Sequence, residues 1–147
     1  MTSALLPGYA LAAYDEIDST NEEAKRRAEA GERGPLWIAA RTQSAGRGRR
    51  GRSWSSEPGN LFATLLLAPG RSAADSARLS FAAALSVYDV VRANCPGADV
   101  ALKWPNDVLI GGAKCSGILL ESGGEQSGVL PWLAVGIGIN LAHAPEG

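Results

Sequence analysis

The sequence lacks several residues on which common active sites depend. Histidine occurs once, at His143, and cysteine twice, at Cys95 and Cys115, so there is no Ser-His-Asp set, no Cys-His pair and no zinc cluster. The two cysteines lack the spacing of metal ligands, and we expect reduced thiols in a cytosolic protein. Any chemistry is therefore expected to use positioning and charge neutralisation, without a side-chain nucleophile.

Long apolar runs are also absent. The longest, near LFATLLLA, has the length of a strand and falls short of a membrane span. The first residues, MTSALLPGYA, have no basic segment and no adequate apolar core, so a signal peptide is not expected. These absences predict a cytoplasmic protein that does not contact membranes.

The overall composition is that of one ordinary globular domain. The chain has 147 residues, 46% apolar and 20% charged, which is enough for a single core. The net charge is −1, but five of the 14 basic residues fall in residues 41–54, RTQSAGRGRRGRSW, which contain no acid. The rest of the chain has nine basic and 15 acidic residues, which give it a net charge of −6. Positive charge confined to one stretch predicts a small anionic ligand more than a nucleic-acid-binding face.

Hydrophobic patterning predicts an α+β fold. The helix signals are N-cap residues at Asp18, Ser19 and Thr20, and Pro96 after a long apolar stripe. The expected order β-α-β-β-α-β-β-β-β favours a mixed, largely antiparallel sheet with helices packed on one face. Strands are expected over residues 9–17, 35–42, 60–68 and 131–141, with two or three more within 99–122, and helices over 20–30 and 71–95.

The arginine- and glycine-rich stretch predicts an anion-binding loop. Its glycines free the backbone for close approach to a ligand, and its arginines offer planar groups that suit phosphate and carboxylate oxygens. Such concentrated like charge predicts a loop that is mobile until an anion orders it. Composition alone leaves a solvated basic loop or an RGG-like RNA contact as alternatives. The residues are Gly46, Gly48, Gly51, Arg47, Arg49, Arg50 and Arg52.

Four further segments place polar groups at the ends of expected elements. DSTN, residues 18–21, can cap a helix or offer hydroxyl and N–H groups to a ligand at its positive end. KWPND, residues 103–107, is either a simple turn or a lysine, amide and carboxylate that orient a metal-bound nucleotide. Lys114, in GGAKCSGILLE, can reach into a cleft or lie on the surface. GIGIN, residues 136–140, leaves one strand face bare for a ligand or another backbone.

These five segments, in this order, resemble the catalytic domain of biotin–protein ligases, the biotin–[acetyl-CoA-carboxylase] ligases, over residues 14–141. The arginine–glycine loop together with KWPND and Lys-x-x-Gly-Ile-Leu is specific to this family, whereas lipoate ligases share the fold without that loop. The resemblance implies a biotin ligase-like fold, of the type found in class II aminoacyl-tRNA synthetases, over residues 1–147. It also implies a C-terminally truncated chain that lacks the N-terminal DNA-binding and C-terminal SH3-like domains of longer members.

The activity implied by the resemblance has two steps. Biotin and ATP, with Mg²⁺, form biotinyl-5′-AMP, and biotin then passes to a lysine of the biotin carboxyl carrier protein of acetyl-CoA carboxylase or a related carboxylase. No DNA binding is implied, and an exposed strand edge favours the homodimer that is common in the family. The shortened chain leaves one alternative, a biotin-binding module with weak or no turnover.

The resemblance also implies a role for individual residues. Lys114, Arg47 and Arg49 are the expected catalytic residues, because adenylation brings a carboxylate onto an α-phosphorus and both anions must be neutralised. A loop that orders over the product would also protect the water-labile mixed anhydride. The resemblance does not identify the residues that hold Mg²⁺. The biotin-binding residues are Ser19, Thr20, Asn21, Gln43, Arg47, Gly48, Arg49 and Lys114, and the nucleotide-binding residues are Arg50, Trp54, Lys103, Asn106, Asp107 and Asn140.

Overall fold

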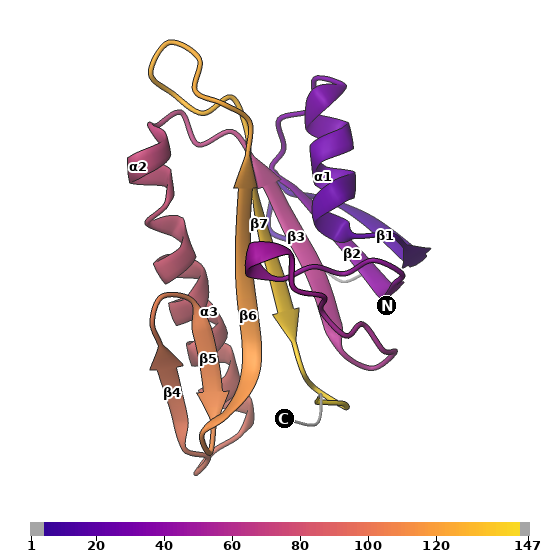
Figure 1. Cartoon of the computed structure of the whole chain (residues 1–147), viewed down its shortest axis with the longest axis vertical. Helices are drawn as coiled ribbons and strands as arrows, with labels where there is room; N and C mark the ends of the chain where they lie inside the picture. The colour runs from indigo at the N-terminus through magenta and orange to yellow at the C-terminus, as the bar shows by residue number, and fades with distance from the viewer. Residues whose placement is uncertain (1–4, 145–147) are drawn as a thin grey trace.

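A computed structural model describes residues 5–144 of the chain, which form one sheet with helices on either side (Figure 1). None of the helices in this range is long and apolar enough to cross a membrane. The elements are β1 (Ala10–Ile17), α1 (Thr20–Glu29), β2 (Leu36–Gln43), the 3-10 helix η1 (Arg49–Gly51), β3 (Leu61–Leu67), α2 (Ala73–Ser76), α3 (Leu79–Asn94), β4 (Val100–Lys103), β5 (Asp107–Ile110), β6 (Ala113–Ser122) and β7 (Leu133–Ile139).

The sheet has seven strands in the order β1-β2-β3-β7-β6-β5-β4. Only β1 and β2 pair in parallel, because α1 carries the chain back between them, and every other pair is antiparallel. The last strand within residues 5–144, β7, enters the middle of the sheet between β3 and β6. The predicted α+β class with a mixed, largely antiparallel sheet is confirmed, and residues 99–122 supply three strands.

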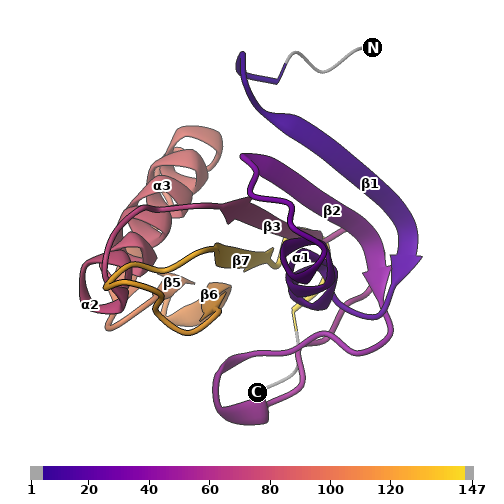
Figure 2. The same cartoon turned by 90° about the horizontal axis from the view of Figure 1, so that it is seen from above.

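The helices occupy both faces of the sheet, not the single face expected from the sequence (Figure 2). On one face, Ala24 of α1 packs with Leu66 and Ala134, which belong to β3 and β7. On the other face, Ala84 of α3 packs with Val135 of β7. Since successive residues of a strand point to opposite faces, Ala134 and Val135 necessarily face different helices. Each apolar face needs a cover, and one helix supplies each.

The long helix expected over residues 71–95 is divided in two. After α2 the amide of Arg78 donates to Asp75 O at 3.2 Å and that of Ser80 donates to Ala77 O at 3.2 Å. These i-to-i+3 bonds tighten the turn, and the Ser80 hydroxyl adds a bond to Ala77 O at 2.9 Å. The helical register is therefore interrupted at Ala77–Arg78, and α3 starts afresh at Leu79.

Candidate functional site

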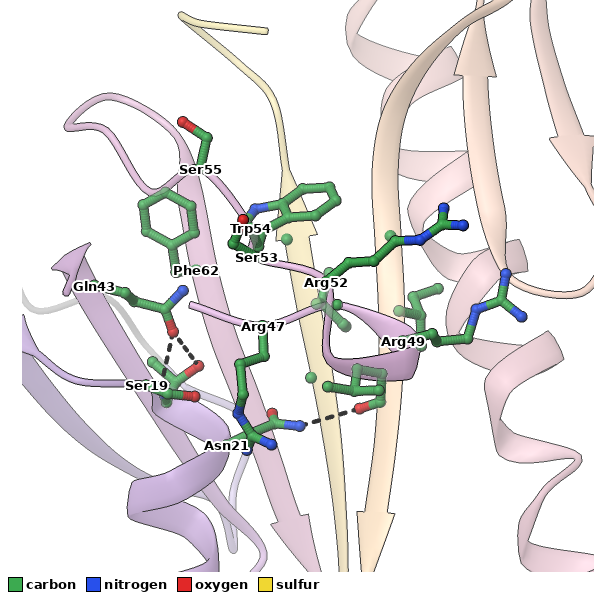
Figure 3. A pocket seen from close by; sticks show the side chains of 18 of the residues that line it. Ser19, Asn21, Gln43, Arg47, Arg49, Arg52, Ser53, Trp54, Ser55 and Phe62 are labelled. Carbon is green, nitrogen blue, oxygen red and sulfur yellow. Dashed lines mark hydrogen bonds between the residues drawn. The ribbon is translucent and has the colours of Figure 1, made fainter. Parts of the chain in front are cut away.

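The face of the sheet that carries α1 also holds a cavity of about 590 Å³ (Figure 3). It lies between the start of α1 and strand β6, above β3 and β7, and the arginine–glycine loop passes over it. Twelve of the fourteen site residues expected from the sequence line this cavity. They are Ser19, Thr20, Asn21, Gln43, Arg47, Gly48, Arg49, Arg50, Trp54, Asp107, Lys114 and Asn140.

Two expected nucleotide-side residues do not line the cavity. Lys103 ends β4, the edge strand of the sheet, where its side chain is exposed. Asn106 is 5% exposed, and its Nδ2 donates to the carbonyl of Ile118, so this amide fastens the turn to β6. The turn reverses the chain between β4 and β5, which leaves only Asp107 of the three polar KWPND residues in the cavity wall.

The floor of the cavity is made of glycines on β6 and β7. A Cβ atom at Gly136 would lie 2.3 Å from Asn21 Oδ1, and one at Gly138 would lie 2.7 Å from Cε2 of Trp54. At Gly117 a Cβ would lie 3.1 Å from the same indole ring. The strand face that GIGIN leaves bare therefore accommodates two side chains of the site, and any larger residue at these positions would displace them.

A chain of hydrogen bonds crosses the buried side of the cavity. The amide of Thr20 donates to Gln43 Oε1 at 2.8 Å, and the hydroxyls of Thr20 and Thr64 are 2.8 Å apart. Thr64 Oγ1 also lies 2.6 Å from Asn21 Oδ1, and Asn21 Nδ2 donates to Glu121 Oε1 at 3.0 Å. Buried polar groups are stable only when paired in this way. The start of α1 is therefore fixed against three strands by its own polar side chains.

The predicted N-cap of α1 is confirmed. Ser19 is the cap residue, and its Oγ accepts from the amide of Glu22 at 3.4 Å. Just before it, the carboxylate of Asp18 accepts two hydrogen bonds from Arg26, each at 2.8 Å, and these hold the pKa of Asp18 down at about 2. The DSTN segment thus caps the helix and lines the cavity at once, so the two interpretations of it are not exclusive.

The arginine–glycine loop folds into a compact turn over the cavity. The amide of Gly48 donates to Arg52 O at 2.7 Å, and that of Trp54 donates to Gly46 O at 2.8 Å. At its tip Arg50 has a φ of 58°, in the left-handed region that is uncommon for residues with a side chain. The position of the loop across the cavity agrees with an anion-binding role. That an anion orders the loop stays a prediction.

Charged groups gather at the β6 end of the cavity. Lys114 Nζ lies 3.2 Å from Asp107 Oδ1 and 5.3 Å from the centre of the Trp54 ring. The Trp54 Nε1 donor is buried and makes no hydrogen bond within residues 5–144. Arg49, on the loop, faces this end, so the cavity can balance two negative groups at once (Figure 3).

The comparisons with known proteins agree with one another. Residues 14–140 match the model of the biotin/lipoate A/B protein ligase family. The chain belongs to this family. A biotin–[acetyl-CoA-carboxylase] ligase of Paracoccus denitrificans is 54% identical over 130 residues, which are 88% of this chain and 53% of that protein. A ligase of the same name from Mycobacterium tuberculosis is 38% identical over 89% of this chain and 49% of its own length.

Solved structures of the family have the same fold. The biotin protein ligase of Leishmania major in complex with biotinyl-5-AMP matches with a TM-score of 0.76 and 30% identity, over 97% of this chain and 61% of that one. The enzyme of Aquifex aeolicus in complex with biotin and ATP matches with a TM-score of 0.75 and 34% identity, over 93% of this chain and 55% of that one. The chain spans about half the length of the curated relatives named above.

Two residues that contact the cavity-lining side chains were not identified from the sequence. Thr64 is fully buried and joins Thr20 to Asn21, and Glu121 accepts from Asn21 at the edge of the cavity. Thr64 carried a usable signal, because it is the one polar residue within the strand LFATLLL. Glu121 carried none, since an acid near the end of a strand is ordinary in any sequence.

Proposed function

We propose that the chain is the catalytic domain of a biotin–protein ligase, which activates biotin with ATP and passes it to a lysine of a biotin carboxyl carrier protein. The observation that carries the proposal is the convergence of two chemistries in one cavity. Neutral hydrogen-bonding groups from the start of α1 and from β2 line one end, where Arg47 of the loop also reaches, and the cationic groups of Arg49 and Lys114 line the β6 end. Biotin has the same division, with a neutral ring system at one end and a carboxylate at the other.

Each end of the cavity suits one part of the substrate. Ser19, Thr20, Asn21 and Gln43 would bind the ring system of biotin, because hydroxyl and amide groups match its urea carbonyl and N–H groups. Arg47, Gly48, Arg49 and Lys114 would bind the carboxylate through cationic and backbone donors. Arg50, Trp54, Asp107 and Asn140 line the space left for the nucleotide. Lys103 and Asn106 are not part of this proposal.

The first half-reaction then requires no side-chain nucleophile. The biotin carboxylate oxygen bonds to the α-phosphorus of ATP, and the bond to the leaving oxygen of pyrophosphate breaks. Both reacting groups are anions, so Lys114, Arg47 and Arg49 act by reducing their repulsion and by stabilising the charge on the transferring group. In the second half-reaction the amine of a carrier lysine bonds to the biotinyl carbonyl carbon, loses a proton, and releases AMP.

Magnesium is expected to enter with ATP. No group of three or more His, Cys, Asp or Glu side chains that could hold a metal lies within residues 5–144, and Asp107 is the one carboxylate of the cavity wall in that range. Mg²⁺ is commonly held by one or two carboxylates, substrate phosphates and water, so Asp107 with the triphosphate is an adequate donor set. When bound, the ion neutralises phosphate charge.

The proposal also covers the cellular location of the protein, the class of its ligand and its assembly. The free thiols of Cys95 and Cys115 agree with the cytoplasm, where ATP and carboxylases are found. The clustered arginines line the cavity, which favours a small ligand over DNA or RNA. Both outer strands, β1 and β4, leave one backbone edge unpaired within the described sheet, and such an edge favours a homodimer.

The test is calorimetry of the purified chain with biotin, followed by pyrophosphate release with biotin, ATP and Mg²⁺. We expect biotin binding that tightens when ATP and Mg²⁺ are present, and release of pyrophosphate that depends on biotin. Biotin binding without pyrophosphate release would favour the alternative, a biotin-binding module. This alternative is considered because the chain spans about half the length of its curated relatives. Absence of biotin binding would remove the proposal altogether.

A further inference from the structure

We propose that Glu121 is a positioning residue that holds Arg47 over the cavity and joins the arginine–glycine loop to the buried side chains of α1. The inference rests on the proposed function, since it concerns how the biotin carboxylate is received. Arg47 Nη2 lies 3.0 Å from Glu121 Oε1 and 2.5 Å from Glu22 Oε1. Neither glutamate lines the cavity, so both act on a ligand through side chains that do, Glu22 through Arg47 and Glu121 through Arg47 and Asn21.

The ion pairs make Arg47 different from its neighbours in the loop. Within residues 5–144, Arg49, Arg50 and Arg52 form no ion pair, whereas Arg47 has two carboxylates. All hydrogen bonds of the Arg47 side chain in that range use Nη2, so Nε and Nη1 remain free to donate to a ligand. The glutamates thus bind one corner of the guanidinium group, fix its plane, and leave the other donors for an incoming carboxylate.

Glu121 differs from Glu22 because it has a second partner. Glu121 Oε1 accepts from Arg47 and also from Asn21 Nδ2, each at 3.0 Å. This contact orients the Asn21 amide, whose Oδ1 then faces Thr64. Removal of Glu121 would therefore leave Arg47 with Glu22 as its one carboxylate within residues 5–144, and would leave Asn21 Nδ2 with only the longer bond to Leu119 O at 3.3 Å. Removal of the Glu22 charge would loosen only Arg47.

The contact between Glu121 and Arg47 has a second interpretation, in which Glu121 competes with the ligand. An experiment can distinguish this interpretation from positioning. If Glu121 merely competed with the ligand carboxylate for Arg47, its loss would strengthen biotin binding. If it positions Arg47, its loss weakens binding, because the freed guanidinium must be ordered again by the ligand. The sign of the change in biotin affinity therefore decides between competition and positioning.

The experiment compares Glu121→Gln, Glu121→Ala and Glu22→Gln with Glu125→Gln as the control, since the Glu125 carboxylate bonds the amide of Ala73 outside the site. We expect the Kd for biotin to rise about tenfold in Glu121→Ala, as for the loss of a hydrogen bond to a charged group. Glu121→Gln, which keeps the shape and an acceptor, should lie between wild type and Glu121→Ala. Glu22→Gln should change the Kd less than Glu121→Ala does, and Glu125→Gln should leave it unchanged.

A double-mutant cycle with Arg47→Ala tests whether the effect passes through Arg47. The part of the Glu121→Ala effect that passes through Arg47 should disappear in the Arg47→Ala background, whereas a general structural defect would add to it. Additive effects, or tighter biotin binding in Glu121→Ala, would overturn the inference. If Glu121→Ala does not fold, Glu121→Gln with Arg47→Ala completes the cycle.

Trypsin digestion without biotin keeps the inference separate from the proposed function. Trypsin cleaves after arginine, and the loop offers Arg47, Arg49, Arg50 and Arg52. We expect faster cleavage in this loop for Glu121→Gln than for Glu125→Gln, because the loop loses its charged attachment. Equal cleavage rates would overturn the inference even if biotin binds. A wild-type chain that binds no biotin would instead overturn the proposed function, while the digestion still tests the contact.

Discussion

The two faces of the central strands differ in chemistry although they share a backbone. Along β3 and β7, the residues that face α3 are large and apolar, such as Leu65, Leu133 and Val135. The intervening residues that face α1 near the cavity include Thr64 and Gly136. Because alternate residues of a strand point to opposite faces, one short segment can supply a closed core on one side and a ligand site on the other.

The two faces of the central strands contribute differently to stability and to ligand binding. On the α3 face, tightly packed apolar side chains gain from burial and dispersion. On the α1 face, the hydroxyl and amide groups of Thr20, Asn21 and Thr64 are buried and must be paired with one another, and the glycine floor gives up packing to make room. Away from the cavity the α1 face has its own apolar core around Ala24, Leu66 and Ala134, so this division applies to the cavity end of the two strands. The predictions below test that division.

The largest effect is expected from emptying the α3 face. Leu133 is 3% exposed, so Leu133→Ala should lower the free energy of unfolding by about 2–5 kcal/mol through lost burial and a cavity. Urea unfolding measures the loss, and calorimetry below the transition should show an unchanged Kd for biotin. Leu85→Ala, at a half-exposed position of α3, is the control and should cost far less. A large loss of biotin affinity in folded Leu133→Ala would contradict the division.

The converse change removes charge from the α1 face. Lys114→Ala and Arg49→Ala should each reduce pyrophosphate release by roughly 10²–10³-fold, as expected for a group that stabilises transition-state charge. Both side chains lie at the open cavity, so the free energy of unfolding measured in urea should change little. Arg78→Ala removes an exposed arginine that does not line the cavity and serves as the control. Activity near wild type in both cavity variants would exclude the assigned catalytic roles.

A smaller effect on both properties is expected from the buried polar network of the α1 face. Thr64→Val keeps the shape of a fully buried side chain but removes the hydroxyl that joins Thr20 and Asn21, which should cost about 1–3 kcal/mol in stability. Biotin affinity should fall as well, because both partners line the cavity. Thr42→Val is the matched control, since its hydroxyl bonds Asp15 O at the surface. Unchanged affinity in Thr64→Val would separate the buried network from binding.

The smallest effect is expected from the surface ion pair beside the site. The Arg26 guanidinium lowers the pKa of Asp18 from 3.8 to about 2, so the folded state binds this proton less readily than the unfolded chain. The stabilisation is therefore present above about pH 4 and is lost as the pH falls through about 2. Because Asp18 is 42% exposed, Asp18→Asn should cost less than about 1 kcal/mol at neutral pH.

Unfolding measured from pH 2 to pH 7 checks this prediction. The curves of wild type and Asp18→Asn should approach each other toward pH 2, where the wild-type carboxylate also becomes neutral. Salt should narrow the difference at neutral pH, since it screens an exposed pair. If the difference in free energy of unfolding between wild type and Asp18→Asn stayed constant down to pH 2, Asp18 would act through its backbone contacts and not through its charge.

Local signals in the sequence predicted most of the elements, and twelve of the fourteen site residues expected from the sequence line the cavity. The strands, the Ser19 cap and the loop follow from apolar periodicity, from capping chemistry and from glycine content, which depend on neighbours along the chain. The structure differs from expectation in the interruption of the long helix near Arg78 and in the two faces that the helices cover, which depend on turns and packing that the local sequence does not specify. Lys103 and Asn106 lie outside the cavity wall, and their expected nucleotide-binding role stays a prediction.

The order of the segments determined which side chains this chain has for binding: hydroxyls and amides at a helix start, arginines in a loop and glycines in a strand. Only the tertiary structure decided that α1 and α3 lie on opposite faces, and that Thr64 and Glu121 join Asn21 and Arg47 in one network. The physical reason is that a strand of alternating residues defines two faces but does not say which one a helix will cover. That choice is made by packing between segments as distant as α1 and β7.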